Sequence, residues 1–179
     1  MNTKKIALIG LMTAVICVLG PISFPLPISP VPISLGVLGV LLAIYLLGMK
    51  WGTVCCLIYL LIGLVGVPVF TGFSGGIGKV LGPTGGYLIG YIFLCLIAGF
   101  FISKWPSKWP LHLAGMVLGT TVMYLFGTLW LGYLLKCTFQ EALWMGVIPY
   151  IPADLIKIVI TLSLGGLVRR QLMRARLVE

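Results

Sequence analysis

Residues 33–66, ISLGVLGVLLAIYLLGMKWGTVCCLIYLLIGLVG, set the class of fold to which this chain belongs. They form two apolar runs, 33–48 and 51–66, joined by a short GMKWG turn that carries Lys50. A helix needs about 17 to 25 apolar residues to cross the hydrocarbon of a bilayer. We therefore predict two neighbouring membrane spans with a tight basic turn between them.

The rest of the chain has the same apolar character. Of its 179 residues, 60% are hydrophobic and 8% are charged, and the mean hydropathy is +1.19. A soluble domain carries about 25% charged residues, because its surface faces water. Further spans are expected at about 6–20, 84–102, 111–135 and 153–170. The sequence thus predicts an all-α integral membrane protein with six transmembrane helices in one membrane domain, 1–179.

The basic residues are distributed unequally between the two sides that six spans define. The side with both termini holds nine of them, and the opposite side holds Lys79 and Lys136. Because positive charge is retained in the cytoplasm, we expect cytoplasmic termini in a multi-pass protein of the cell membrane. Topology then accounts for the net charge of +9 without a nucleic-acid partner. The nine are Lys4, Lys5, Lys50, Lys104, Lys108, Arg169, Arg170, Arg174 and Arg176.

Three connections fall together on the outer side. The first, PISFPLPISPVP at 21–32, has too many prolines for a helix and favours extended backbone. The second, 67–86, is rich in glycine, and the third is 136–152. Irregular backbone near a membrane is tolerated against protein or a water-filled cavity. We interpret the three as irregular loops that cover a substrate pocket open to the outside.

Residues 151–160, IPADLIKIVI, place two charges at the start of the last span. Pro152 suits the first turn of a helix, where Asp154 is favoured by the helix dipole. A spacing of three puts Lys157 on the same face as Asp154. A structural ion pair, or a lysine that extends to the headgroups, is one interpretation. A ligand site is the other, because ionisable residues inside membranes are usually functional.

The glycine-rich stretch GGIGKVLG lacks the order of a phosphate-binding loop, since no Ser or Thr follows Lys79. We expect Thr84, Gly86 and Tyr87, at the start of the fourth span, either to contact a ligand or to pack against a helix. Lys79 either attracts an anionic substrate or is a solvated loop lysine. His112 is expected at the membrane interface, and Trp130 and Tyr133 either stack on a ligand ring or face lipid.

The first span carries small residues on one side, at Ala7, Gly10 and Ala14. Small residues at this spacing allow another helix to approach closely. The contact is either within the bundle or with a partner protein.

The stretch GLVGVPVFTGFSGGIGKVLGPTGGYLIGY, 63–91, followed by PADLIK, 152–157, resembles the BioY family along essentially the whole chain. BioY proteins are the biotin-specific substrate-capture (S) components of energy-coupling-factor transporters. The resemblance implies that Asp154 and Lys157 contact biotin and that GPTGGY, 82–87, lies at the substrate pocket. It also implies that the face around Gly10 and Ala14 docks on a transmembrane coupling subunit, which connects to two cytosolic ATPases. No enzymatic activity, cofactor or metal is expected.

Two other classes of function remain as alternatives. A self-sufficient secondary transporter would couple uptake to an ion gradient through Asp154, although no inverted repeat is evident. An intramembrane enzyme would use Cys55 or Cys56 with His112, but these residues are expected at different depths.

Overall fold

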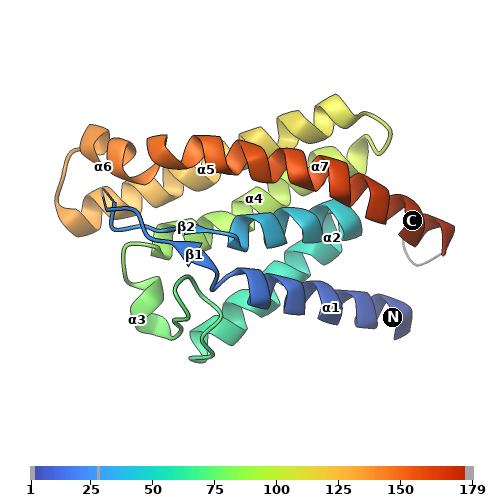
Figure 1. The fold of residues 1–179 in the computed structure, drawn as a ribbon, viewed down its shortest axis with the longest axis horizontal. Helices are drawn as coiled ribbons and strands as arrows, with labels where there is room; N and C mark the ends of the chain where they lie inside the picture. The colour runs from blue at the N-terminus through green and yellow to red at the C-terminus, as the bar shows by residue number, and fades with distance from the viewer. Residues whose placement is uncertain (1–2, 28, 176–179) are drawn as a thin grey trace.

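The computed structural model of the chain describes residues 3–27 and 29–175 (Figure 1). Arg176, one of the basic residues counted above, lies outside this part. Its elements are, in order, α1 (Thr3–Leu19), β1 (Ser23–Phe24), β2 (Ile33–Ser34), α2 (Gly36–Leu64), α3 (Ile77–Val80), α4 (Gly85–Lys104), α5 (Trp109–Leu135), α6 (Phe139–Gly146), the 3-10 helix η1 (Ile148–Tyr150) and α7 (Ile151–Arg174). The predicted all-α architecture is confirmed, apart from one two-residue strand pair.

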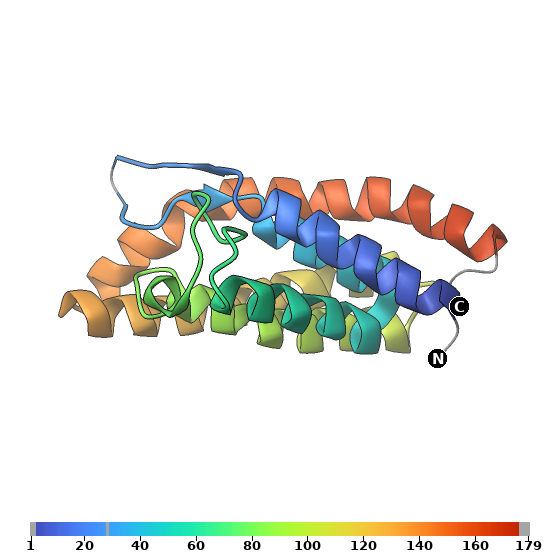
Figure 2. The ribbon, with the colours of Figure 1, turned by 90° about the horizontal axis from the view of Figure 1, so that it is seen from below.

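Within the described residues, four helical stretches are long and apolar enough to cross a membrane. The stretches are Gly36–Leu64, Gly85–Lys104, Trp109–Leu135 and Phe139–Arg174. Helix α1 runs alongside them, and α2 contributes two arms because it folds back on itself (Figures 1 and 2). Six helical segments therefore make up the bundle in the described part: α1, the two arms of α2, α4, α5 and α7.

The reversal of α2 takes place at Gly48, whose backbone has φ 75° and ψ −176°. Glycine adopts this conformation readily, whereas a side chain would strain it. A Cβ on Gly52 would lie 2.6 Å from the Cα of Ile44. In a straight helix these residues, eight apart, would be separated by roughly 12 Å at 1.5 Å per residue. The two arms correspond to the apolar runs 33–48 and 51–66 of the sequence.

Glycines allow the central helix, α4, to pack closely against α5 and α2. A Cβ on Gly90 would lie 2.9 Å from the Cα of Met123 on α5, and one on Gly99 would lie 2.6 Å from the Cα of Met49 on α2. Phe93 and Phe126 stack across the α4–α5 contact with their ring centroids 4.3 Å apart. Close approach of backbones at small residues is how helices associate inside membranes.

Both termini lie at one end of the bundle, and the connections expected to be irregular lie at the other (Figures 1 and 2). In the described part of the proline-rich segment, β1 and β2 are extended and pair antiparallel, with Ser23 opposite Ser34. This segment contacts the glycine-rich segment through the amide of Gly72, which donates to the carbonyl of Pro21 at 3.1 Å. These two segments are called the proline loop (21–35) and the glycine loop (65–84) below.

One local expectation was wrong. The connection 136–152 is not irregular but contains α6, which begins with a capping box in which Thr138 and Glu141 bond each other's backbone amides. His112, in the first turn of α5, is 2% exposed; its Nε2 donates to the carbonyl of Trp105 at 2.9 Å, and its ring meets the edge of Tyr45. Its place at the membrane interface stays a prediction. The turn after α4 folds over the histidine and removes it from the surface.

Candidate substrate site

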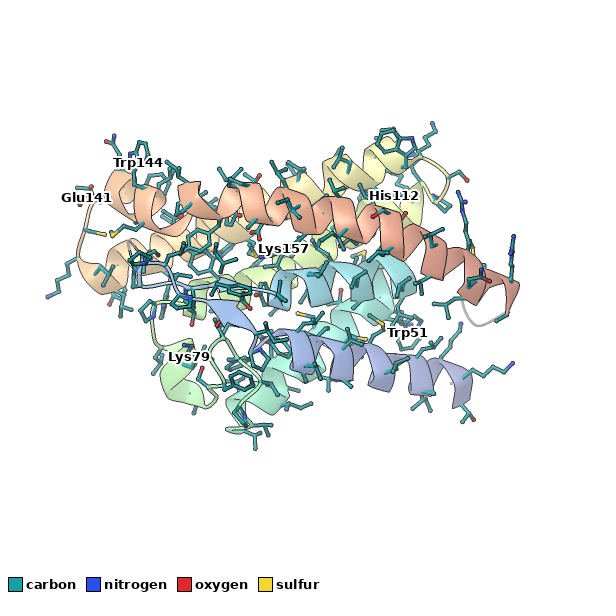
Figure 3. The ribbon with its side chains drawn as sticks, viewed as in Figure 1. Trp51, Lys79, His112, Glu141, Trp144 and Lys157 are labelled. Carbon is teal, nitrogen blue, oxygen red and sulfur yellow. The ribbon has the colours of Figure 1, made fainter. Side chains whose placement is uncertain are left out.

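Asp154 and Lys157 lie inside the bundle, under the two loops. Pro152 stands in the first turn of α7, which places Asp154 in that turn and Lys157 one turn further along the same face. Each residue is 5% exposed, and the Lys157 Nζ lies 2.5 Å from the Asp154 Oδ1. Figure 3 shows Lys157 in the middle of the bundle, away from both ends. Both charges are therefore buried and paired.

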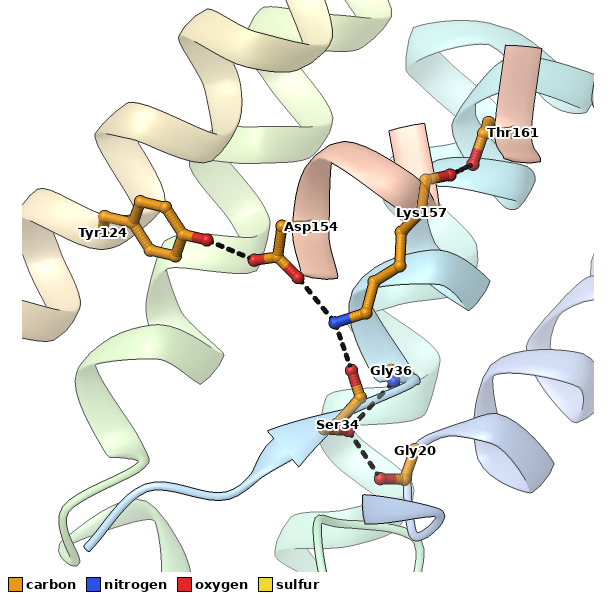
Figure 4. Close-up of polar contacts among 7 residues, drawn as sticks. All are labelled: Gly20, Ser34, Gly36, Tyr124, Asp154, Lys157 and Thr161. Atoms are coloured by element: carbon orange, nitrogen blue, oxygen red, sulfur yellow. Dashed lines mark hydrogen bonds and ion pairs between the residues drawn. The ribbon is translucent and has the colours of Figure 1, made fainter. Parts of the chain in front are cut away.

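Two further groups complete the surroundings of this pair (Figure 4). The hydroxyl of Tyr124 on α5 donates to the Asp154 Oδ2 at 2.5 Å, and the Lys157 ammonium donates to the carbonyl of Ser34 at 2.7 Å. The Ser34 hydroxyl in turn donates to the carbonyl of Gly20 and accepts from the amide of Gly36, both at 2.9 Å. The charged pair thus links α7 to α5 and to the end of the proline loop.

A cavity of about 50 Å³ lies beside the pair, between the loops and helices α4, α5 and α7. Its lining is rich in hydroxyl groups, and it includes the charged pair. A pocket for a small organic ligand usually has a volume of about 300–1,000 Å³, so this cavity is smaller than such a pocket. The polar residues of the lining are Ser34, Thr71, Thr84, Tyr87, Tyr91, Tyr124, Tyr150, Asp154 and Lys157.

Thr84 and Tyr87 of the GPTGGY motif reach this cavity, as expected from their position. Both are buried, at 6% and 8% exposure. The Tyr87 hydroxyl donates to the carbonyl of Gly146 at 2.7 Å, which ties α4 to the end of α6. The Thr84 hydroxyl lies 3.5 Å from the carbonyl of Lys79. The structure therefore brings four of the six predicted substrate residues together, and their role in binding stays a prediction.

Gly86 and Lys79 do not line the cavity. A Cβ on Gly86 would lie 2.4 Å from the Cβ of Trp130 and 2.6 Å from the carbonyl oxygen of Phe126, so this glycine allows α4 and α5 to touch. Lys79 lies on the short helix α3, at the edge of the molecule (Figure 3). Partial burial lowers the pKa of the Lys79 ammonium from its usual value. A contact with substrate remains a prediction for both residues.

A larger cavity, of about 370 Å³, opens between α5, α6 and α7 and shares Tyr124 and Asp154 with the smaller one. Tyr124 and Asp154 therefore lie between the two cavities. The lining of the larger cavity is otherwise mostly apolar and includes the half-exposed Leu125, Leu155 and Phe139. A specific ligand site needs several convergent polar groups, so the smaller cavity is the candidate site.

Five further polar residues of the lining were not predicted from the sequence: Tyr124, Tyr150, Ser34, Tyr91 and Thr71. Tyr124 could have been found, because it borders the stripe Thr120, Met123, Gly127 that is buried at helical spacing. Ser34 contributes a backbone carbonyl to Lys157, which no sequence pattern indicates.

The two aromatic residues named as stacking candidates do not reach the cavity either. Trp130 donates its Nε1–H to the carbonyl of Gly82 at 2.9 Å, which fixes the turn before α4. Tyr133 is 81% exposed on the outside of α5. The Tyr133 side chain therefore points away from the interior of the bundle and from the cavity.

The small-residue face of α1 points out of the bundle. Ala7, Gly10 and Ala14 are all exposed, and a Cβ on Gly10 would meet nothing within 4 Å. The neighbouring Leu11 is also exposed, at 59%, whereas the opposite face carries the buried Met12 and Ile16. The alternative in which these small residues mediate packing inside the bundle was therefore wrong.

Comparisons with known proteins agree with this architecture. The model of the BioY family matches residues 1–174. The chain is 40% identical over 157 residues to a probable biotin transporter BioY of Pyrococcus horikoshii, covering 88% of this chain and 91% of that protein. It is 38% identical over 151 residues to the biotin transporter BioY of Thermotoga maritima, covering 84% and 87%.

A solved structure is similar as well. The crystal structure of the S-component for biotin from an ECF-type ABC transporter superposes with a TM-score of 0.88 at 32% identity, over 95% of each chain. The family match spans nearly the whole chain, the relative of Pyrococcus horikoshii is covered over most of its length, and the solved structure shares the fold. The chain therefore belongs to the BioY family.

Proposed function

We propose that this protein is a high-affinity biotin-binding S component, which captures biotin at the outer face of the membrane for ATP-driven uptake by partner subunits. The observation that carries the proposal is the buried Asp154–Lys157 pair, which lies beside a hydroxyl-lined cavity under two loops. Membership of the BioY family, whose relatives above are named as biotin transporters, supports biotin as the substrate.

The chemistry of the pair suits a ureido group. Biotin offers two ureido N–H donors and a carbonyl, an apolar fused ring and a valerate carboxylate. The Asp154 carboxylate accepts one bond at each oxygen, from Lys157 and Tyr124, and a carboxylate has about four acceptor positions. In the proposed complex Asp154 accepts from the ureido N–H groups, while Lys157 orients the carboxylate and donates to the ligand.

Substrate entry requires the loops to move, because the cavity of about 50 Å³ is smaller than a vitamin. Several hydrogen bonds hold the proline loop against the bundle and the glycine loop. The Tyr150 hydroxyl donates to the carbonyl of Val31, Lys157 donates to the carbonyl of Ser34, and the amide of Gly72 donates to the carbonyl of Pro21. We propose that this loop is the lid and that biotin is enclosed when these contacts form.

The distribution of charge supports the orientation. Lys50, Lys104 and Lys108 occupy the turns at the end with both termini, where α7 also carries Arg169 and Arg170. Lys79 and Lys136 occupy the opposite end. By the preference for positive charge in the cytoplasm, the termini are cytoplasmic and the lid faces outward in the cell membrane.

The exposed face of α1 supports docking on a transmembrane coupling subunit. Ala7, Gly10 and Ala14 leave a flat strip on which a partner helix packs closely. The sequence contains no nucleotide-binding loop, so ATP hydrolysis belongs to two cytosolic ATPase subunits that act through the coupling subunit.

Equilibrium binding of labelled biotin to the purified protein in detergent tests the proposal. We expect dissociation constants on the order of nanomolar, which correspond to about −12 kcal/mol. Excess unlabelled biotin should displace the label, whereas excess riboflavin should not. Absence of saturable binding to a monodisperse, helical preparation would overturn the assignment of biotin.

A further inference from the structure

The proposed function makes no use of the cavity of about 370 Å³ between α5, α6 and α7. Figure 1 shows α6, which forms one of its walls, at the end of the bundle opposite the termini. The volume falls within the range of about 300–1,000 Å³ that is usual for a pocket that holds an organic ligand. An empty space of this size between packed helices forfeits dispersion contacts along its walls, and an occupant restores them.

Most polar groups in the lining of this cavity are bonded to the protein or buried. The hydroxyl of Thr121 donates to the carbonyl of Val117 at 2.9 Å, and the hydroxyl of Tyr124 donates to Asp154 at 2.5 Å. The hydroxyl of Thr120 has no partner among the described residues, but its oxygen is buried. An ordered water needs about two to four polar partners, so the cavity favours an apolar occupant.

The cavity is continuous with the surface of the bundle that faces lipid. Leu125 of α5 and Leu155 of α7 line it and are half-exposed. The apolar surface continues beyond it at Leu129 and Ile156, which are exposed and do not line the cavity. Because both helices belong to stretches long and apolar enough to span the membrane, hydrocarbon covers this surface and reaches the cavity.

The length of the cavity suits an aliphatic chain. On α5 its lining runs from Val117 to Thr128, and these eleven residues of helix cover roughly 16 Å. The hydrocarbon core of a bilayer is about 30 Å thick, so the acyl chains of one leaflet occupy about 15 Å. Phe139 and Leu143 of α6 add apolar side chains to the lining. The cavity is therefore long enough and apolar enough to receive one acyl chain.

We propose that this cavity holds one acyl chain of a phospholipid from the leaflet on the α6 side of the protein. The chain packs against Leu125 and Leu155, while the headgroup stays in the interface and makes no specific contact. Tyr124 and Asp154 lie between this cavity and the candidate substrate site, so the chain covers their hydrogen bond from the lipid side. The lipid site does not depend on the assignment of biotin.

Native mass spectrometry of the delipidated full-length protein tests this proposal. The protein is incubated with mixed micelles of phosphatidylglycerol and phosphatidylcholine, in equal amounts and with the same acyl chains. We expect one retained phospholipid per protein, with both headgroups retained about equally. Leu155→Trp places a large side chain in the cavity and should lower lipid retention about fivefold, because packing contacts of the chain are lost. Ile156→Trp adds similar bulk at the neighbouring exposed position outside the cavity and should retain the lipid.

Thermal unfolding in detergent gives a second readout. Added phospholipid should raise the unfolding temperature of wild type and of Ile156→Trp more than that of Leu155→Trp, since a ligand stabilises the state that binds it. If Leu155→Trp fails to fold, Leu125→Trp provides the same comparison on α5. Its control is Leu129→Trp, an exposed position one turn further along that helix and outside the cavity.

Several results would overturn the proposal. Equal retention in Leu155→Trp and Ile156→Trp would show that the lipid binds elsewhere on the surface, and no retention by wild type would show that the cavity takes no lipid. A strong preference for one headgroup would show a headgroup site instead. Displacement of the lipid by saturating biotin would assign the cavity to the substrate. A wild-type dimer that Leu155→Trp abolishes would show that a second copy of the chain covers this surface.

Discussion

Tyr124 on α5 donates a hydrogen bond of 2.5 Å to one oxygen of Asp154 on α7, while Lys157 lies 2.5 Å from the other. The carboxylate is therefore held from two sides by groups on two helices. The carboxylate lines the small cavity under the proline loop. A pre-organised carboxylate of this kind lowers the entropic cost of binding a ligand.

Removing the Tyr124 hydroxyl should loosen this arrangement without opening a cavity. In Tyr124→Phe we expect the free energy of unfolding to fall by about 1 to 2 kcal/mol, because a hydrogen bond to a charged group is lost inside the membrane. Biotin affinity should fall by about three- to tenfold, as measured by equilibrium binding. Tyr133→Phe makes the same change at an 81% exposed position of the same helix and should leave both quantities unchanged.

Lys157→Met should leave the Asp154 charge buried and uncompensated. Breaking a buried ion pair from one side costs about 3–5 kcal/mol, whereas replacing both partners by apolar residues is often neutral. We therefore expect thermal unfolding at a lower temperature in Lys157→Met and recovery in the double variant Asp154→Leu, Lys157→Met. The recovered double variant should bind no biotin. Binding at wild-type affinity by the double variant would show that the pair has only a structural role.

Tyr150→Phe should weaken the closure of the lid. The Tyr150 hydroxyl donates to the carbonyl of Val31 and lies 2.6 Å from the Ser29 hydroxyl, and no other described residue makes this connection between η1 and the proline loop. Losing it should raise the dissociation rate of biotin about fivefold, with a smaller change in the association rate. A chase of bound labelled biotin measures this rate. An unchanged dissociation rate would exclude Tyr150 as a lid contact.

Gly86→Ala distinguishes helix packing from ligand contact at the GPTGGY motif. Its Cβ would lie 2.4 Å from the Cβ of Trp130, so α4 and α5 must move apart. We expect a loss of about 1–3 kcal/mol in the free energy of unfolding, which thermal denaturation in detergent reports. Gly78→Ala is the control, since a Cβ there meets nothing within 4 Å. Normal stability with weakened biotin binding would instead favour direct contact at Gly86.

Much of this organisation follows from local sequence patterns. The apolar runs and the GMKWG turn predict the hairpin of α2, because glycine is what allows the reversal at Gly48. The spacing of Asp154 and Lys157 predicts their pairing, because three residues span nearly one helical turn. The capping box of α6 was also present in the sequence, as Thr138 and Glu141, and was overlooked.

Other features depend on contacts between distant segments. The bond from Lys157 to the carbonyl of Ser34 joins residues 123 apart, and it uses a backbone atom that every residue carries. Tyr124 faces Asp154 because of the orientation of α5 about its own axis relative to α7. The hydrophobic periodicity of the sequence predicts only which face of α5 is buried, and not this orientation. The burial of His112 likewise depends on the turn at Trp105, which folds back over it.

The most direct test of the account is biotin affinity in Asp154→Asn, which removes the charge and preserves the shape of the side chain. The control is Glu141→Gln, the same chemical change at the exposed cap of α6. We predict at least tenfold weaker binding in Asp154→Asn, or about 1.4 kcal/mol, with unchanged binding in the control. Equal affinity of wild type and a folded Asp154→Asn variant would contradict the claim that this carboxylate recognises the substrate.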